Sequence, residues 1–441
     1  MQPVDLIINA RWVLPMEPAG LVIRDGGVAI RDGRILEVAS QQSLRQRFSA
    51  AKQVDRPQHA LLPGLVNAHA HAAMALLRGV PLEQSVLAWL RRSIWPIERR
   101  WVSAEFVRTG SQLFIAQLLR AGVTCFADMY YFPEEVAPLA SLARIRIAVG
   151  VPVIDQATAW SAGADDCLDK GAALWDALRG DPWASLYFAP HAPYSVSDQA
   201  LARLRTIVDQ LDAPVAMHLH ESATEVQDGL ATHGLRPLER LDALGLLRPG
   251  FAAVHMVHCS ASDIETTARK GVAVVHCPQS NLRLGSGIAP VGEMLDHGIT
   301  VAIGSDGPAS SGAPDLLAET RIAAMLAAGM SGHPRRIAPL DALRMATLDG
   351  ARALGLGDQI GSLSAGKYAD LIAIDLSRCT DLAPADVADS VLQDATRADV
   401  SDVWTAGQAC VENRELRTLD LPEVRERARY WATRVGAGSA P

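Results

Sequence analysis

Long apolar runs, paired cysteines and an excess of positive charge are all missing from this chain of 441 residues. No run approaches the roughly 18 apolar residues that a membrane helix needs, so we expect no association with a membrane. The N-terminus has no basic segment followed by an apolar one, so we expect no signal peptide. The six cysteines include no Cys-x-x-Cys pair, which favours reduced thiols in a cytoplasmic protein. A net charge of −8 excludes a nucleic-acid scaffold, although a small nucleoside stays open as a ligand.

The two ends of the chain share one pattern. Residues 1–60 contain short apolar runs separated by glycine turns, and Asp32-Gly33 between two such runs is a hairpin signal. Residues 361–441 show the same pattern of short apolar runs separated by glycine turns. A few strands are marginal without a partner sheet. We therefore predict that both ends pair into one small β-sandwich domain, with a C-terminal tail beyond it.

The middle of the chain, residues 61–360, has a different sequence pattern. Eight nearly continuous apolar runs of strand length alternate with segments long enough for a helix, which is typical of a parallel sheet covered on both faces. The runs begin near residues 61, 122, 145, 186, 214, 252, 271 and 298. Eight such units predict an α/β fold, a (β/α)₈ TIM barrel, whose reactive groups lie at the C-terminal ends of the strands.

Histidines gather at the ends of these runs. Eight of the 12 lie there: His69, His71, His191, His218, His220, His255, His258 and His276. His69 and His71 stand two apart on one strand and point to the same face, where both imidazoles can bind one metal ion. His218 and Asp306 complete a set of three imidazoles and one carboxylate. This mixture suits one Zn²⁺ ion per subunit, with Fe²⁺ as the alternative, better than Ca²⁺ or Mg²⁺.

Three strand-end residues can move protons beside such a metal, which lowers the pKa of bound water towards 7. Asp306 can accept the proton of the water, and Glu221 can deliver a proton to a substrate nitrogen. His255 can hydrogen-bond a developing oxyanion. Together these residues predict hydrolytic chemistry.

Taken in order, these residues resemble the amidohydrolase superfamily over almost the whole chain. The motifs that match its mononuclear deaminase branch are His69-x-His71 after Pro63-Gly64, His218-x-x-Glu221, His255 and Gly304-Ser305-Asp306-Gly307. The segment Gly361–Leu371 matches the return of the family's chain into its β-sandwich. Three further segments are similar to the subgroup that deaminates 5′-methylthioadenosine and S-adenosylhomocysteine: Leu76–Val80, Pro190–Tyr194 and Ser280–Gly287.

The resemblance implies a role for each residue. It assigns His69, His71, His218 and Asp306 as metal ligands, and Glu221, His255 and Asp306 as the catalytic groups. It places the ribose hydroxyls of an adenine nucleoside on Glu98, and the purine pocket at His191 and Trp89. The implied reaction converts the 6-amino group to the inosine-type oxygen and releases ammonia. The arginines that hold the homocysteine carboxylate in some members have no matching motif, although Arg144 and Arg146 lie in the corresponding region.

Other interpretations stay open. A binuclear amidohydrolase needs a carboxylated lysine at a strand end, and none of the four lysines lies at one. Guanine, cytosine, pterin and triazine remain alternative substrates, although a free base has no ribose for Glu98 to hold. A barrel that only binds ligands has no need of the proton-moving residues. Glu98 beside Arg99 also fits a solvated face, Trp89 also fits a core, and the sequence leaves a homo-oligomer open.

Overall fold

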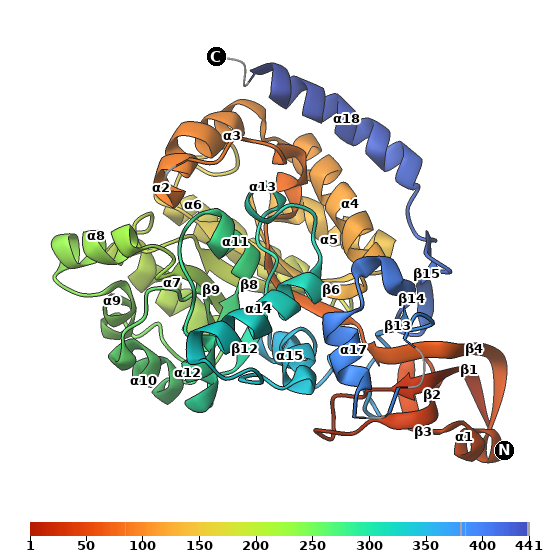
Figure 1. The fold of residues 1–441 in the computed structure, drawn as a ribbon. Helices are drawn as coiled ribbons and strands as arrows, with labels where there is room; N and C mark the ends of the chain where they lie inside the picture. The colour runs from red at the N-terminus through yellow and green to blue at the C-terminus, as the bar shows by residue number, and fades with distance from the viewer. Residues whose placement is uncertain (84, 380–381, 384, 439–441) are drawn as a thin grey trace.

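The computed structural model describes residues 1–83, 85–379, 382–383 and 385–438. Residues 380, 381, 384 and 439–441 of the predicted C-terminal part, and residue 84, lie outside the described residues. A barrel forms the body of the molecule, and a second sheet lies beside it, at the lower right of Figure 1. The chain therefore has the two-part organisation that the sequence predicts.

Eight parallel strands form the barrel, which confirms the predicted (β/α)₈ fold. In sheet order they are β5 (Leu65–Ala70), β6 (Val123–Met129), β7 (Arg146–Val153), β8 (Ala184–Pro190), β9 (Val215–Leu219), β10 (Phe251–His255), β11 (Ala273–His276) and β12 (Val301–Ile303). A bridge between Ala70 and Asp306 joins the last strand to the first. Asn67 strengthens this closure, because its amide nitrogen donates to Ser305 Oγ at 2.7 Å and its oxygen accepts from the Ser305 amide at 2.9 Å.

Helices cover the outside of the barrel (Figure 1). They are α4 (Ala104–Arg120), α5 (Val136–Ala143), α6 (Ala164–Ala177), α7 (Asp198–Leu211), α8 (Ala223–His233), α9 (Pro237–Ala243), α10 (Ala261–Arg269), α11 (Pro278–Arg283), α12 (Val291–Asp296), α13 (Pro308–Ser311), α14 (Leu316–Ser331), α15 (Pro339–Met345) and α16 (Leu348–Ala353). Short helical segments follow β5 at the barrel mouth: η1 (Ala72–Leu77), α2 (Val86–Trp89), η2 (Leu90–Ile94) and α3 (Trp95–Trp101).

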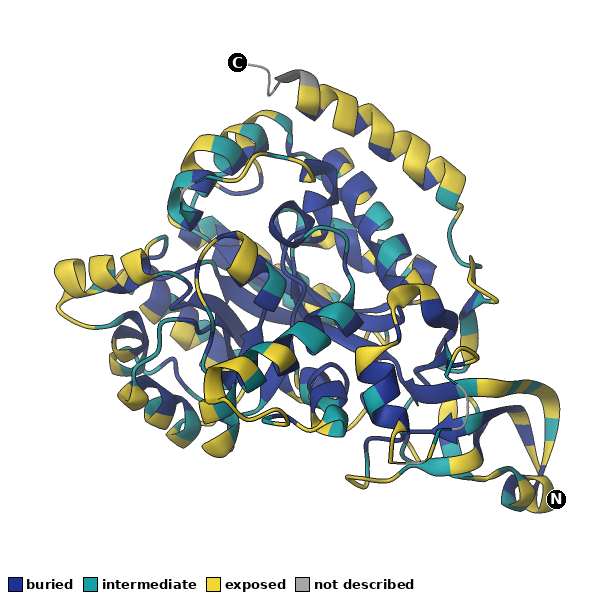
Figure 2. Ribbon diagram, viewed as in Figure 1, coloured by how far each residue is buried: buried dark blue, intermediate teal, exposed yellow. Residues whose placement is uncertain are grey.

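The strands are buried on both faces, as Figure 2 shows by their dark blue colour. In β10, Phe251 and Ala253 join the large core under the helices, whereas Ala252 and Val254 belong to a separate inner core. Small side chains dominate that inner core and fill the interior of the barrel, so the interior is packed and is not a pore. This double burial explains why the strands read as continuous apolar runs in the sequence.

The second sheet joins the two ends of the chain, as predicted. Its order is β16 (Glu415–Leu416), β15 (Gln408–Glu412), β14 (Val400–Thr405), β13 (Leu371–Asp375), β4 (Phe48–Pro63), β1 (Gln2–Val13), β2 (Ile23–Arg31) and β3 (Arg34–Ser40). The antiparallel pairing of β4 with β13 links the halves. Gly64 connects β4 directly to β5, and any side chain there would collide with Thr124, whose Oγ1 lies 2.0 Å from the position of a Cβ.

The C-terminal tail forms a feature that the sequence did not predict. Helix α18 (Leu421–Gly438) leaves the small sheet and lies across the barrel, at the top of Figure 1. Trp431 anchors it, with its ring packed edge-on against Phe106 of α4 at 5.3 Å between centroids. The remaining helices of the small-sheet side are α1 (Gln41–Arg47) and α17 (Val387–Gln393). Among the described helices, none combines the length and the hydropathy of a membrane span.

Candidate active site

One pocket at the C-terminal ends of the barrel strands collects nearly all of the residues predicted from the sequence. Its lining includes His71, Trp89, Glu98, His191, His218, Glu221, His255 and Asp306. His69 lies directly behind them, fully buried. These nine residues from distant parts of the chain meet in one place, which is the arrangement expected of a barrel active site.

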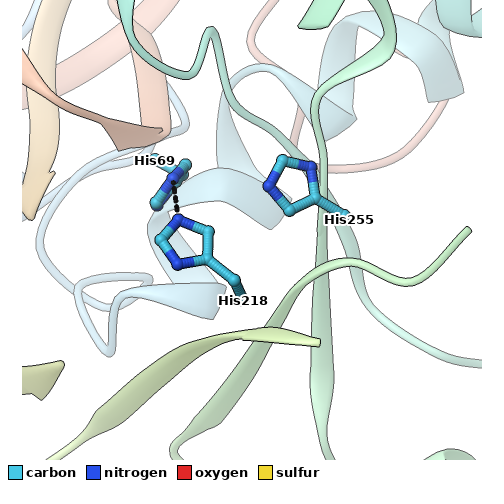
Figure 3. A group of neighbouring side chains, drawn as sticks. All are labelled: His69, His218 and His255. Carbon is cyan, nitrogen blue, oxygen red and sulfur yellow. Dashed lines mark hydrogen bonds between the residues drawn. The ribbon is translucent and has the colours of Figure 1, made fainter. Parts of the chain in front are cut away.

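Three histidine rings point toward one another at the base of this pocket (Figure 3). The Nε2 atoms of His69 and His218 are 3.1 Å apart, and Asp306 Oδ1 lies 3.7 Å from His69 Nε2 and 3.2 Å from His71 Nε2. His255 stacks on His218 with 5.5 Å between ring centroids. Nitrogen and oxygen donors this close together can share one metal ion.

The outer nitrogens show which ring atoms face the centre. His71 Nδ1 donates to the carbonyl of Met129, and His218 Nδ1 donates to the carbonyl of His191, both at 2.6 Å. A carbonyl only accepts, so each Nδ1 carries a proton and each Nε2 faces the centre of the cluster. This second layer of hydrogen bonds is typical of metal-binding histidines.

Asp306 is held so that one oxygen faces the histidines. Its Oδ2 accepts from Ser280 and from Ser310, the latter at 3.1 Å, and its Oδ1 accepts from the Gly307 amide at 2.6 Å. The backbone of Asp306 has a left-handed φ of 58°, and His255 has one of 78°. Such conformations cost free energy and concentrate at functional sites.

Burial favours the neutral imidazole at two of these histidines. Burial lowers the pKa of His69 to about 4, and it lowers the pKa of His218 well below its usual value. Burial also acts on His71, but the adjacent Asp306 carboxylate outweighs it and raises the pKa to about 9. The pKa of Asp306 stays well below its usual value despite burial, because His69 and His71 hydrogen-bond it. Two neutral rings, one ring paired to a carboxylate and that carboxylate make a donor set that fits one divalent cation.

Glu221 and His255 stand on the rim of this donor set. Glu221 Oε1 is 3.8 Å from His255 Nε2, and burial raises the pKa of Glu221. His255 Nδ1 is 2.8 Å from Asn281 Oδ1, which holds the ring with its Nε2 towards Glu221. A buried carboxyl with a raised pKa keeps its proton closer to neutral pH, as an acid catalyst requires.

The far side of the pocket is lined by Glu98 and Trp89. Glu98 is buried and accepts a hydrogen bond from Tyr130 Oη at 2.8 Å, so it does not lie on a solvated face with Arg99. Burial raises its pKa to about 7. Trp89 is 4% exposed, and its Nε1 has no hydrogen-bond partner among the described residues. A buried donor without a partner at a pocket wall is a position that a ligand can satisfy.

Sequence reasoning missed the residues that hold the predicted ones in place. Ser280 and Asn281 lie in the segment Ser280–Gly287, whose resemblance to the subgroup gave neither side chain a role, and nothing in the sequence marks Ser310. Tyr130, one residue beyond β6, is distinguished only by being polar at a strand end. Glu225 was also missed, although it accepts from the backbone amides of His220 at 2.7 Å and Glu221 at 3.0 Å.

Two arginines considered for the substrate lie elsewhere. Arg146 begins β7, at the opposite end of the barrel from the pocket, and pairs with Asp370 at 2.7 Å. Arg144 precedes it, and its backbone carbonyl accepts from Thr405 Oγ1. His220 faces away from the predicted metal ligands, as strand alternation predicts, and its Nε2 accepts from the Leu238 amide at 3.2 Å.

Comparison with known proteins agrees with this geometry. The model of the amidohydrolase family matches residues 60–410. The chain belongs to the amidohydrolase family. Two relatives named 5-methylthioadenosine/S-adenosylhomocysteine deaminase are 39% identical over 438 residues (Saccharophagus degradans; 99% of this chain, 98% of the relative) and 40% identical over 436 residues (Teredinibacter turnerae; 98% of each). A crystal structure of an adenosine deaminase from Xanthomonas campestris with bound zinc superposes with a TM-score of 0.96 at 42% identity, covering 99% of both chains.

The family membership confirms several predictions from the sequence. The amidohydrolase resemblance, the barrel with its second sheet, and a hydrolase acting on C–N bonds are all confirmed. A site for one divalent metal ion is supported by the family and by the histidine cluster. The domain boundaries at residues 60 and 360, the cytoplasmic location and a homo-oligomeric state stay predictions.

Proposed function

We propose that this amidohydrolase is a zinc-dependent deaminase that hydrolyses the 6-amino group of adenine nucleosides. The observation that carries the proposal is that Glu98, Glu221, His255 and Asp306 line one pocket over a cluster of imidazoles. The first three can serve ribose, ring nitrogen and oxyanion, and the fourth can accept a proton. Names of the relatives, which include methylthioadenosine and S-adenosylhomocysteine deaminases, point to the same substrates.

His69, His71, His218 and Asp306 are the residues that would hold the zinc ion. When bound, the ion supplies Lewis-acid activation of a water molecule at neutral pH. Three histidines with one carboxylate favour zinc over magnesium or calcium, and the similar Xanthomonas campestris structure contains zinc.

The proton transfers fall to the chain's own side chains. Asp306 takes a proton from the attacking water, and Glu221 gives its proton to N1 of the purine while the water oxygen bonds to C6. His255 Nε2, which faces Glu221 at 3.8 Å, stabilises the charge that develops on the attacking oxygen. The proton on Asp306 then passes to the amino nitrogen, and the hydroxyl group on C6 gives its remaining proton back to Glu221. The C6–N bond breaks, and ammonia leaves with the inosine-type product.

The walls of the pocket favour a compact apolar group at the 5′ position. Val86, Leu90, Ile94, Trp95 and Leu284 contribute to the lining, and no lysine or arginine does so among the described residues. A methylthio group can be buried there at little cost, whereas the charged amino acid of S-adenosylhomocysteine must stay at the mouth. We therefore expect 5′-methylthioadenosine to be the better substrate.

The test is ammonia release by the zinc-loaded protein. The substrates are methylthioadenosine, S-adenosylhomocysteine, adenosine, guanine and cytosine, each compared by kcat/KM. Highest activity on methylthioadenosine supports the proposal in full. Activity on a free base alone would keep the hydrolytic chemistry and overturn the ribose assignment of Glu98. No activity on any of the five with zinc bound would direct the search to pterins and triazines.

A further inference from the structure

A second hollow lies behind the active site. It has a volume of about 600 Å³ and sits between α18 and the layer formed by η1 and α13. Leu76 of η1 and Ala309 of α13 line it. Met74 and Ser310 of the same two segments line the catalytic pocket instead. The two cavities therefore share a wall, and the hollow is not part of the catalytic pocket.

Four arginines line this hollow, from three distant parts of the sequence: Arg78, Arg283, Arg425 and Arg429. Arg78 and Arg283 belong to two segments that resemble the deaminase subgroup, yet neither lines the catalytic pocket. The fold brings them together because α18 returns over η1.

None of the four guanidinium groups makes a hydrogen bond, an ion pair or a ring contact with any described residue. No described acidic side chain lines the hollow. This contrasts with Arg427 on the same helix, which pairs with Glu423. In a chain with 49 acidic and 41 basic residues, four unpaired cations around one hollow are a marked local excess of positive charge.

All four arginine side chains are exposed, and the segments that carry them place them around the hollow. Arg283 Nη1 lies 3.4 Å from where a Cβ at Gly312 would stand, so the guanidinium packs against the turn after α13. Arg425 and Arg429 are one turn apart on α18 and flank the buried Ala428. Four like charges gathered in one hollow repel one another, and an anion between them removes that repulsion.

We propose that this hollow binds a phosphate group, either as free inorganic phosphate or as part of a small phosphorylated metabolite. Arginine is suited to this because its planar fork donates two parallel hydrogen bonds to phosphate oxygens. The concave shape and the small apolar floor fit a compact anion better than a flat acidic protein surface. The inference concerns the wall behind the pocket and stands independently of the substrate proposed above.

The experiment is titration calorimetry of the full-length, zinc-loaded protein with inorganic phosphate at constant ionic strength in chloride. The wild type should bind phosphate. The double variant Arg283→Gln/Arg429→Gln should bind it roughly tenfold or more weakly, since hydrogen bonds to charged groups are lost. Circular dichroism checks that the variant is folded.

A matched control is the double variant Arg120→Gln/Arg335→Gln. Both residues are exposed and lack a side-chain partner among the described residues, so the net charge changes equally. Its affinity should stay within about twofold of the wild type, because distant exposed charges are screened. Absence of phosphate binding in the wild type overturns the proposal. An equal loss of phosphate affinity in both double variants also overturns it, because net charge alone would then explain binding. So does an unchanged affinity in both variants, which places phosphate on the zinc ion.

Ribose 5-phosphate and ribose distinguish the two sources of the phosphate group. Tighter binding of ribose 5-phosphate than of inorganic phosphate, with none of ribose, assigns the hollow to a phosphorylated metabolite. Equal or weaker binding assigns it to free phosphate.

Discussion

His218 donates a hydrogen bond of 2.6 Å from Nδ1 to the main-chain carbonyl of His191. The side chain of His191 lines the pocket where we place the purine, and His218 Nε2 faces the imidazole cluster. One peptide group thus sets both the tautomer of a ring that we propose as a metal ligand and the start of the loop that faces the proposed purine pocket. The proposed metal site and the proposed substrate site therefore share one structural support.

Replacing His71 with alanine should empty the metal site. The variant loses one Nε2 donor, and the carboxylate of Asp306 loses the ring that pairs with it at 3.2 Å. We expect the zinc content to fall from about one ion per chain to roughly a tenth of that, measured by elemental analysis after dialysis. His258→Gln is the control, because His258 bonds the Ser286 carbonyl outside the cluster and its loss should leave zinc bound.

Replacing Glu221 with glutamine should separate metal binding from turnover. The amide cannot donate a proton to N1 as an acid, so we expect kcat to fall by roughly 10²–10⁴ with zinc retained. The exposed Glu265→Gln variant provides the control and should be fully active. If Glu221→Gln works at the normal rate, Glu221 has no part in the mechanism.

Glu98 should give the KM for nucleosides a pH dependence. Burial raises its pKa to about 7, so the carboxyl is neutral below that pH and ionised above it. The ionised form accepts hydrogen bonds from both ribose hydroxyls, so KM should fall by roughly tenfold as the pH rises from 6 to 8. In Glu98→Gln this dependence should vanish and KM stay high throughout. An unchanged pH profile in the variant would assign the titration to another group.

Trp89 should contribute a hydrogen bond to the substrate. Its buried Nε1 has no partner among the described residues. Trp89→Phe keeps an aromatic ring but removes the donor, so we expect KM to rise by about three- to tenfold with kcat little changed. Trp101→Phe, outside the pocket lining, should behave as wild type. A normal KM for Trp89→Phe would leave Trp89 as a packing residue.

Arg146 should stabilise the fold without contacting substrate. It is buried, pairs with Asp370, donates to the Pro182 carbonyl at 2.6 Å and lies over the ring of Tyr368. Arg146→Met leaves a buried carboxylate unpaired, so we expect a loss of about 3–5 kcal/mol in the free energy of unfolding, measured in denaturant. Its KM should be unchanged, since it lies at the other end of the barrel. The exposed Arg144→Met should change neither quantity.

The sequence predicted the barrel because its strands are buried on both faces and therefore read as apolar runs. It predicted His69, His71, His218 and Asp306 because each stands at the end of such an apolar run. A polar side chain at that position does not serve core packing and therefore indicates a functional role. These two signals follow from local chemistry and from strand geometry alone. They are the part of the site that a single sequence displays.

The supporting residues could not be predicted, since their partners are far away in the chain. In the sequence, nothing distinguishes Asn67 from other polar residues. Its role becomes visible only in the closed barrel, where it hydrogen-bonds Ser305. The position of Arg146 depended on pairing with Asp370, 224 residues away. Helix α18 gave no signal that it would return over η1, because its amphipathic pattern does not specify which surface it covers.

The pairing of β4 with β13 has a consequence for synthesis on the ribosome. Strand β4 leads straight into β5, which carries His69, yet its partner β13 begins only at Leu371. At a translation rate of roughly 5–20 residues per second, the edge of β4 that pairs with β13 stays unpaired for tens of seconds while the barrel is synthesised. The order of translation therefore leaves the nascent chain with an unpaired strand edge until Leu371 and the strand that begins there have emerged.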